Sequence, residues 1–250
     1  MHECIQDLIK KIDAILEDPT FVKKGAKILP HGQIDICSLL NRLSFDIIGE
    51  TAFGESFRMV QEDNHPVPKQ MAKTLKRSMQ YAFNPWIRWL VPMDYSFLSF
   101  AADRVKKRQD AGESARRADL LQFMLDAQAN ERACGNGETG DEYGDMISGK
   151  LTDQAVETEA MVFLVAGSET SSTAMTHTLM YLVNNPKALK RLREELDQAT
   201  VNNPPGALPT YDQVRNLPYL TACINESMRL RPVAASGHPR EVNEDTVMAG

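Results

Sequence analysis

The stretch Ala166–His177, AGSETSSTAMTH, places a glycine and a run of hydroxyl and acidic side chains inside an otherwise apolar segment. If the segment is helical, Gly167 costs about 1 kcal/mol relative to alanine, and serine and threonine compete for the helix's backbone hydrogen bonds. A glycine removes bulk beside a large or flat ligand, whereas Thr170 and Glu169 can hold water or a small polar species. We therefore interpret this stretch as a polar groove that a ligand requires.

The segment around this groove, from Asp153 to Val183, is predicted to be one long helix. Thr152 precedes it as a good N-cap, and the sequence NNP ends it. Its first half contains MVFLVAG, which is apolar on every face and typical of a helix through the centre of a protein. About thirty residues at 1.5 Å each extend about 45 Å, so the groove at the midpoint is expected to lie deep inside.

Amphipathic helices are predicted on both sides of this central helix, because apolar residues recur there at spacings of three and four. Asp35 caps one helix, which ends near Gly54, and Thr210 with Gln213 forms a capping box. Pro186 and Pro218 each open a helix. The predicted helical segments are 4–16, 35–54, 68–83, 95–110, 117–131, 186–198 and 218–232. The fold class is therefore mainly α, with 134–149 as a loop.

The composition excludes several classes of protein. A net charge of -6, without a dense tract of lysine and arginine, gives little support to nucleic-acid binding. Four separated cysteines without a CxxC pair argue against a disulfide scaffold and a zinc site. No apolar run reaches the ~18 residues needed to span a bilayer, so this chain is expected to be soluble or peripheral.

Aromatic side chains cluster in segment 84–100, NPWIRWLVPMDYSFLSF. We expect ordinary core packing for them, because large aromatic side chains stabilise a fold most when they are buried. The lining of a ligand channel and contact with a membrane surface are the alternatives. The residues concerned are Trp86, Trp89, Tyr95, Phe97 and Phe100.

Two charged residues of the last helix, Glu226 and Arg229, are three apart and therefore share one face. Taken alone, this pattern indicates a surface ion pair worth under about 1 kcal/mol.

The order of the motifs favours another interpretation. A central helix with A-G-x-E-T, followed by E-x-x-R, LRP and an extended stretch that ends PREVNEDTVMAG, resembles cytochrome P450 monooxygenases. Residues 35–57, DICSLLNRLSFDIIGETAFGESF, are similar to the fungal branch of that family. The resemblance covers essentially the whole chain. It implies one partial P450 domain over residues 1–250, mainly α, with a short extended stretch at its C-terminal end.

This resemblance implies roles for the groove residues. Ala166 and Gly167 would make room for bound oxygen and substrate over the distal face of a haem. Thr170 would hydrogen-bond the oxygen or its water, and Glu169 would be the acid beside the proton relay that O–O cleavage needs. Three further hydroxyl residues, Ser171, Ser172 and Thr173, would bond back to their own helix.

The resemblance also implies roles nearer the C-terminal end. Glu226 and Arg229 would form a buried structural charge pair near the proximal face, where loss of one partner is costly. Arg240 would pair with a haem propionate, a bidentate role that suits a guanidinium. The substrate pocket would be apolar and lined by Phe163, Val233 and Ala234.

One departure from the family pattern concerns the haem ligand, which lies in an F-x-x-G-x-R-x-C-x-G stretch downstream of E-x-x-R. No cysteine of this chain has that context. Cys134 comes nearest, with Arg132 two residues before it, but the phenylalanine and glycine positions differ. The resemblance therefore implies an internal fragment, truncated at both ends, that supplies no metal ligand and is inactive by itself.

The parent protein is expected to be a haem-thiolate monooxygenase that inserts one oxygen atom of O₂ into an apolar organic substrate. Its electrons would come from NADPH through a cytochrome P450 reductase. It would work at the surface of the endoplasmic reticulum membrane, with membrane contact only through an upstream anchor. The alternative is a non-catalytic helical remnant without enzyme activity of its own.

Overall fold

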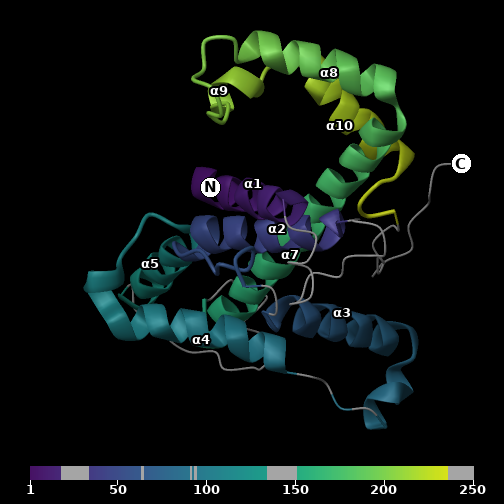
Figure 1. Ribbon diagram of the computed structural model, residues 1–250. Coiled ribbons are helices and arrows are strands. Elements are labelled where there is room, and N and C mark those ends of the chain that lie inside the picture. The colour runs from purple at the N-terminus through teal and green to yellow at the C-terminus, as the bar shows by residue number, and fades with distance from the viewer. Residues whose placement is uncertain (18–33, 63–64, 91, 93–94, 134–150, 236–250) are drawn as a thin grey trace, which may run out of the picture. The chain divides into compact units, whose positions relative to one another are not determined.

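The computed structural model describes residues 1–17, 34–62, 65–90, 92, 95–133 and 151–235. These residues form helices joined by turns, and no strand occurs among them, so the mainly α prediction is confirmed (Figure 1). Most of the extended stretch expected after the last helix lies outside the described residues. The chain divides into a first unit, Met1–Thr176, and a second unit, His177–Gly250. A single domain over residues 1–250 stays a prediction.

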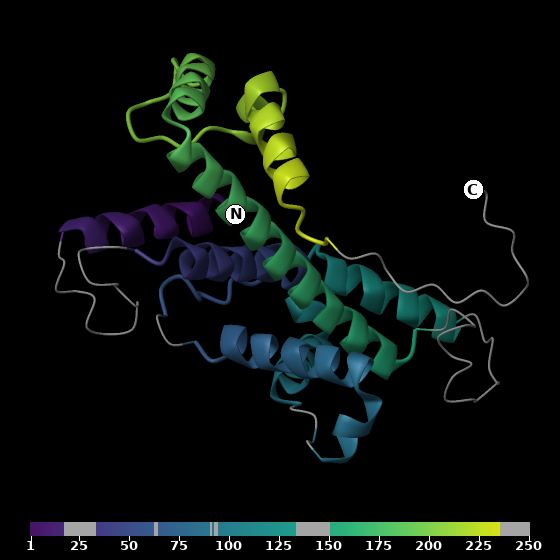
Figure 2. The ribbon, with the colours of Figure 1, turned by 90° about the vertical axis from the view of Figure 1, so that its right-hand side faces the viewer.

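The helices of the first unit lie close to the segments predicted from the hydrophobic pattern. The long helix α7 (Asp153–Asn184) begins in this unit, and its last residues belong to the second. Within the first unit α7 runs obliquely beside α2 and α3 (Figures 1 and 2). The helices before it are α1 (His2–Glu17), α2 (Ile36–Phe53), α3 (Val67–Phe83), α4 (Ser96–Ala111) and α5 (Leu120–Ala133), with short 3-10 helices η2 (Pro85–Trp89) and η3 (Gly112–Ala115).

Local capping fixes the ends of α2 and α7 where the sequence predicts them. The Asp35 carboxylate accepts a hydrogen bond from the Ser38 N–H at 3.1 Å, which caps α2. Gly54 ends that helix at φ 65°, a left-handed conformation that favours glycine. The Thr152 hydroxyl accepts from the Ala155 N–H at 3.1 Å and caps α7.

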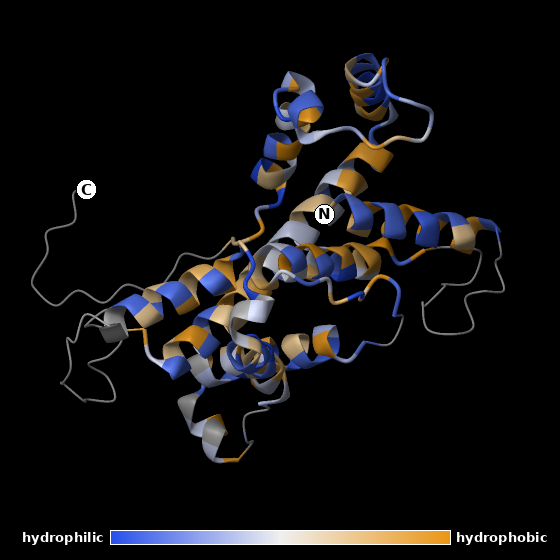
Figure 3. Ribbon diagram, turned by 90° about the vertical axis from the view of Figure 1, so that its left-hand side faces the viewer, coloured by the Kyte–Doolittle hydropathy of each residue, from blue (hydrophilic) through white to orange (hydrophobic). Residues whose placement is uncertain are grey.

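The core of the first unit forms around α7. Phe45 of α2, Met71 of α3, Phe97 of α4 and Leu164 of α7 are each 0% exposed and belong to one apolar cluster. A second cluster joins α1 to α2. Hydrophilic residues are frequent along α1, whereas apolar residues are more frequent along α2 (Figure 3). The helix that carries the predicted groove is therefore anchored by buried side chains from three other helices.

The aromatic residues of segment 84–100 divide between core and surface. Phe97 is fully buried, and Phe100 packs against the same cluster. Trp86, Trp89 and Tyr95 are instead exposed, so the expectation of core packing is wrong for these three. Trp86 and Trp89 lie in the short helix η2 and Tyr95 lies just before α4, and more than half of each residue stays exposed there.

The second unit contains the end of α7 and three shorter helices. These are α8 (Pro186–Ala199), α9 (Tyr211–Val214) and α10 (Pro218–Leu230), and prolines open α8 and α10 as predicted. The Gln213 side chain accepts from the Thr210 N–H at 2.9 Å, which confirms the capping box. Of the helices in the described residues, none combines the length and apolar character that a bilayer crossing needs.

The first turn of α10 is capped from α8 rather than from its own sequence. Both carboxylate oxygens of Glu195 accept backbone N–H groups, from Tyr219 and Leu220, each at 2.9 Å. The guanidinium of Arg191 lies 4.2 Å from the centre of the Tyr219 ring. These contacts hold α8 and α10 together. The donors are the N–H groups after Pro218, since proline has no N–H of its own.

Candidate functional site

The polar stretch of α7 is divided between a buried face and an open one. Ser168 is 0% exposed and Ser172 is 4% exposed. Ala166 and Thr170 are exposed. The buried face repeats every four residues, as helical geometry requires, and consists of Val156, Ala160, Leu164, Ser168 and Ser172.

The buried hydroxyls are satisfied within the helix and by its neighbours. Ser168 donates to the Leu164 carbonyl, and its hydroxyl lies 3.6 Å from the sulfur of Met71. Ser172 donates to the Glu169 carbonyl at 3.1 Å, as predicted for a hydroxyl that bonds back to its own helix. Ser172 also accepts from the Asn41 amide at 3.3 Å. Part of the hydroxyl run therefore serves helix packing.

Gly167 faces α2. A Cβ at this position would lie 2.6 Å from Cδ1 and 2.8 Å from Cγ1 of Ile48, so any side chain would collide with that residue. The resemblance assigns the room at Gly167 to oxygen and substrate. In this structure the place of the missing side chain is filled by Ile48, and the room serves the close approach of α2 and α7.

The open face of α7 carries the residues expected to do chemistry. Phe163, Ala166 and Thr170 are spaced by three, four and seven positions, so they lie along one side of the helix, and Phe163 is half-buried. The Thr170 hydroxyl donates to the Ala166 carbonyl at 2.6 Å. Glu169, half-buried, is adjacent. We call Phe163, Ala166 and Thr170 the open face.

Thr170 also bonds back to its own helix. The sequence had led us to expect this only of the neighbouring hydroxyl residues. This bond uses the single hydroxyl hydrogen and leaves the oxygen's lone pairs available as acceptors. The hydroxyl is thereby oriented without being withdrawn from solvent. A water or a polar ligand on the open face can donate to it.

Glu226 and Arg229 form a bidentate ion pair on α10. The Arg229 Nε and Nη2 donate to the two Glu226 oxygens at 2.7 and 2.8 Å. These hydrogen bonds lower the pKa of Glu226 and raise that of Arg229. The arginine and glutamate side chains are 68% and 55% exposed, so the expected burial is not observed. The reason is that no described element of the second unit covers this face of α10.

The remaining predicted residues are not brought to the open face by the described structure. Val233 is half-buried and Ala234 is exposed, and both follow α10 in the second unit. Their grouping with Phe163 in one substrate pocket stays a prediction. Arg240 lies outside the described residues, as does Cys134.

The cysteines that the structure describes are free thiols. Cys4 is 4% exposed, and burial together with a hydrogen bond to Glu50 raises its pKa to about 11. A thiol with such a pKa stays protonated at neutral pH, and only the thiolate is a good metal ligand. Within the described ranges no group of three or more His, Cys, Asp or Glu side chains could hold a metal ion.

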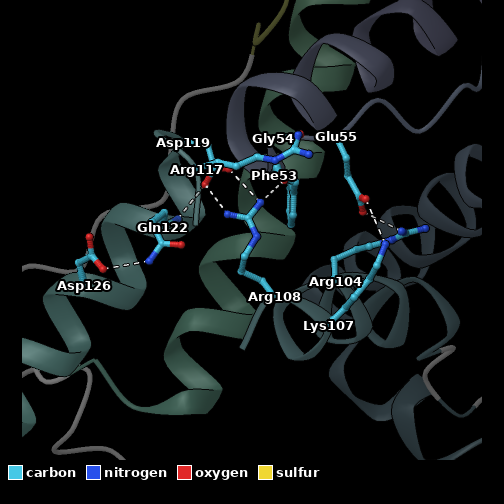
Figure 4. Close-up of polar contacts among 10 residues, drawn as sticks. All are labelled: Phe53, Gly54, Glu55, Arg104, Lys107, Arg108, Arg117, Asp119, Gln122 and Asp126. Atoms are coloured by element: carbon cyan, nitrogen blue, oxygen red, sulfur yellow. Dashed lines mark hydrogen bonds and ion pairs between the residues drawn. The ribbon is translucent and has the colours of Figure 1, made fainter. Parts of the chain in front are cut away.

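A buried ion pair outside the motifs joins α4 to the start of α5, and it was missed at the sequence level (Figure 4). Arg108 contacts both oxygens of Asp119, at 2.9 and 3.2 Å, and also donates to the Phe53 carbonyl at the end of α2. The two side chains are 9% and 3% exposed. Asp119 also accepts from the Gln122 N–H at 2.8 Å, and this cap before an apolar run was the available sequence signal.

Basic residues surround the end of α2 next to this pair (Figure 4). Arg104 and Lys107 bind the Glu55 carboxylate at 2.8 and 3.1 Å, and Arg117 donates to the Gly54 carbonyl. Cations at a helix C-terminus compensate its partial negative charge. The cluster therefore fastens α2, the helix that packs on Gly167, to α4 and α5.

A second buried carboxylate holds the chain after α2. Asp46 is 2% exposed and accepts from the N–H groups of Met59 and Val60 at 2.8 and 3.0 Å. Burial raises the pKa of Asp46, and the two backbone donors oppose that shift. Asp46 therefore has a structural role, because it fixes the segment after α2 against the buried side of that helix.

The comparisons with known proteins identify the family of this chain. The family model for cytochrome P450 matches residues 1–250. The chain is 33% identical to the cytochrome P450 monooxygenase mpsF of Macrophomina phaseolina, covering 100% of this chain and 56% of that protein. It is 28% identical to a bifunctional cytochrome P450/NADPH–P450 reductase of Bacillus cereus, covering 92% of this chain and 20% of that protein.

Solved structures show the same fold. The crystal structure of the cytochrome P450DA heme domain superimposes with a TM-score of 0.63 at 24% identity, over 91% of this chain and 44% of that one. The chain spans about half the length of the monooxygenase and the heme domain that it matches. The match over the full chain, with the polar stretch at the middle of its longest helix, shows that this chain belongs to the cytochrome P450 family.

Proposed function

We propose that this chain forms one wall of the haem and substrate site of a monooxygenase. The whole protein would insert one oxygen atom of O₂ into an apolar organic substrate. The observation that carries the proposal is the open face of α7, where Phe163, Ala166 and Thr170 line one side of the central helix while the neighbouring hydroxyls are buried.

The open face fits one side of a haem. A flat macrocycle needs a wall of small or apolar residues, and Ala166 offers a methyl group with Phe163 one turn before it. When bound, haem with a thiolate ligand supplies the chemistry of O–O cleavage. Burial raises the pKa of the Cys4 and Cys223 thiols, and no described cysteine has the sequence context of the ligand, so we assign these residues to the wall and not to the ligand.

Thr170 and Glu169 would move protons at this wall. The Thr170 oxygen, oriented by its bond to the Ala166 carbonyl, accepts a hydrogen bond from a water on the open face. Glu169, half-buried beside it, would return protons to that water from solvent. Arg240 would hold a propionate, and Val233 and Ala234 would complete the apolar substrate pocket.

The reductase partner is proposed on the likeness to the Bacillus cereus protein, whose name joins a cytochrome P450 to an NADPH–P450 reductase in one polypeptide. Electrons from NADPH would reach the haem through such a partner. The surface of the endoplasmic reticulum membrane stays the proposed location. The Glu226–Arg229 pair would act as structural support once other parts of the fold cover it.

The experiment that tests the proposal is a reduced carbon-monoxide difference spectrum of the whole protein after haem loading. A thiolate-type Soret band is expected, and its absence from a folded, haem-loaded protein would contradict the proposal. The 250-residue chain, treated in the same way, should give no such band, because no cysteine in it has the context of the ligand. A stable band from that chain would show that one of its own cysteines binds the iron.

A further inference from the structure

The contact between α2 and α7 runs along both helices in opposite directions. Successive contacts on α2 meet α7 residues that come progressively earlier in the chain. Two of them are side-chain hydrogen bonds and one is a steric contact, which gives the interface a defined register. The contacts are Cys37 Sγ to Thr176 Oγ1 at 3.6 Å, Asn41 Nδ2 to Ser172 Oγ at 3.3 Å, and Ile48 against Gly167.

The contact at Gly167 is steric. Its ideal Cβ would lie 2.6 Å from Cδ1, 2.8 Å from Cγ1 and 3.3 Å from Cβ of Ile48. Rotation of the isoleucine can move Cδ1 away, but Cγ1 and Cβ stay near because they are close to the backbone, and a β-branched side chain has few rotamers in a helix. Ile48 therefore limits how far α7 can turn at this point.

The contact at Ser172 is polar and lies more than one turn further along α7. It depends on direction, because the Asn41 amide must meet the Ser172 hydroxyl at hydrogen-bond distance. Two contacts of different kinds at two heights resist a roll of α7 about its own axis. Either contact alone would resist that roll less.

The roll matters because the open face adjoins this interface. Thr170 is one turn beyond Gly167, and Ala166 directly precedes it. A roll of about 10° moves an atom that lies about 5 Å from the helix axis by about 1 Å. A misplacement of about 1 Å can cost about 10²-fold in rate.

We propose that Ile48 and Asn41 are positioning residues that set the rotation of α7, and thereby the direction in which Thr170 points at the site. The inference rests on the proposed function of the Thr170 hydroxyl. Gly167 is the partner of Ile48 in this device. Its absent side chain is the condition for the close helix contact.

The test places a chemical probe on the open face of the intact chain. In a Thr170→Cys background, the alkylation rate of the new thiol is measured by peptide mass spectrometry, which reads each cysteine separately. Gly167→Ala should change that rate at least threefold, because the added methyl group turns α7 away from Ile48. Adding Ile48→Ala should bring the rate back to within about 1.5-fold of the parent.

The matched control is Ile47→Ala, because Ile47 neighbours Ile48 but packs against the cluster between α1 and α2. It should not restore the rate. An unchanged rate in Gly167→Ala, or equal restoration by both alanine variants, would overturn the proposal. If Gly167→Ala does not fold, Asn41→Leu serves instead, because it keeps the number of side-chain heavy atoms and removes the hydrogen bond to Ser172. It should change the rate at least twofold, and no change would overturn the proposal.

This probe separates the positioning role from the proposed function. The alkylation rates report the rotation of α7 without any haem or turnover. In the haem-loaded whole protein, Asn41→Leu should also lower the product formed per NADPH consumed at least twofold. If the alkylation results hold and Thr170→Val leaves that ratio unchanged, the role of Thr170 is wrong while the positioning of α7 stands.

Discussion

Replacing Arg108 with methionine should lower the unfolding free energy of the first unit by about 3–5 kcal/mol. The substitution keeps most of the aliphatic stem but leaves the Asp119 carboxylate, whose side chain is 3% exposed, without its counter-charge. It also removes a donor to the Phe53 carbonyl at the end of α2. The cap that Asp119 provides to Gln122 survives, so the loss reports the ion pair and its burial.

The chain offers a matched control for this change in Arg116→Met. Arg116 meets Asp126 at the same N–O distance, 2.9 Å, as Arg108 meets Asp119, but its pair is 50% and 40% exposed. Exposed pairs contribute about 0–1 kcal/mol, so this variant should unfold close to the parent. Urea unfolding followed by far-ultraviolet circular dichroism measures both. Costs that agree within about 0.5 kcal/mol would refute the reasoning that burial makes the Arg108 pair strong.

Three further predictions concern a helix cap, the cysteines and a buried carboxylate. Glu195→Ala should lower the free energy of unfolding of the second unit in urea by about 1–2 kcal/mol, because it removes the cap of α10. The control is Glu194→Ala, whose side chain is 59% exposed and whose loss should cost under about 0.5 kcal/mol. Equal costs would contradict the cap. At pH 8, iodoacetamide should modify the exposed Cys37 in the native chain. Cys4, with its pKa of about 11, should stay unmodified until the chain unfolds. Equal labelling of both cysteines in the native chain would show that Cys4 is not buried. Burial raises the pKa of Asp46, so the ionised carboxylate opposes folding and this group costs the parent stability as the pH rises from below 3.8 to 7. Over this range the free energy of unfolding of Asp46→Asn should therefore rise relative to that of the parent. A difference between the two proteins that does not vary with pH would contradict this.

Helix positions and ends could be predicted from the sequence because they depend on neighbouring residues. Asp35 and Thr152 cap the helices expected of them, and Gly54 takes the left-handed conformation that ends α2. The single long helix from Asp153 is also present, ending at Asn184. The order of the motifs was enough to indicate the family that the full-length match shows.

Contacts between distant segments could not be predicted in this way. Gly167 contacts Ile48, which lies more than one hundred residues earlier in the chain. The family motif does not reveal which side chain packs against this glycine. Arg108 reaches a carbonyl fifty-five positions away. The burial of Glu226 and Arg229 depends on which elements cover α10, and helical spacing predicts only that the two residues meet.

The most direct test of the central claim, that the Thr170 hydroxyl on the open face holds the water through which protons are delivered, is the amount of product formed per NADPH consumed. Thr170→Val keeps the shape of the side chain and removes the hydroxyl, and Ser171→Ala removes a neighbouring exposed hydroxyl as the control. In the haem-loaded whole protein with its reductase, Thr170→Val should lower the ratio by about tenfold or more, while Ser171→Ala leaves it unchanged. An unchanged ratio with unchanged turnover in Thr170→Val would contradict the claim.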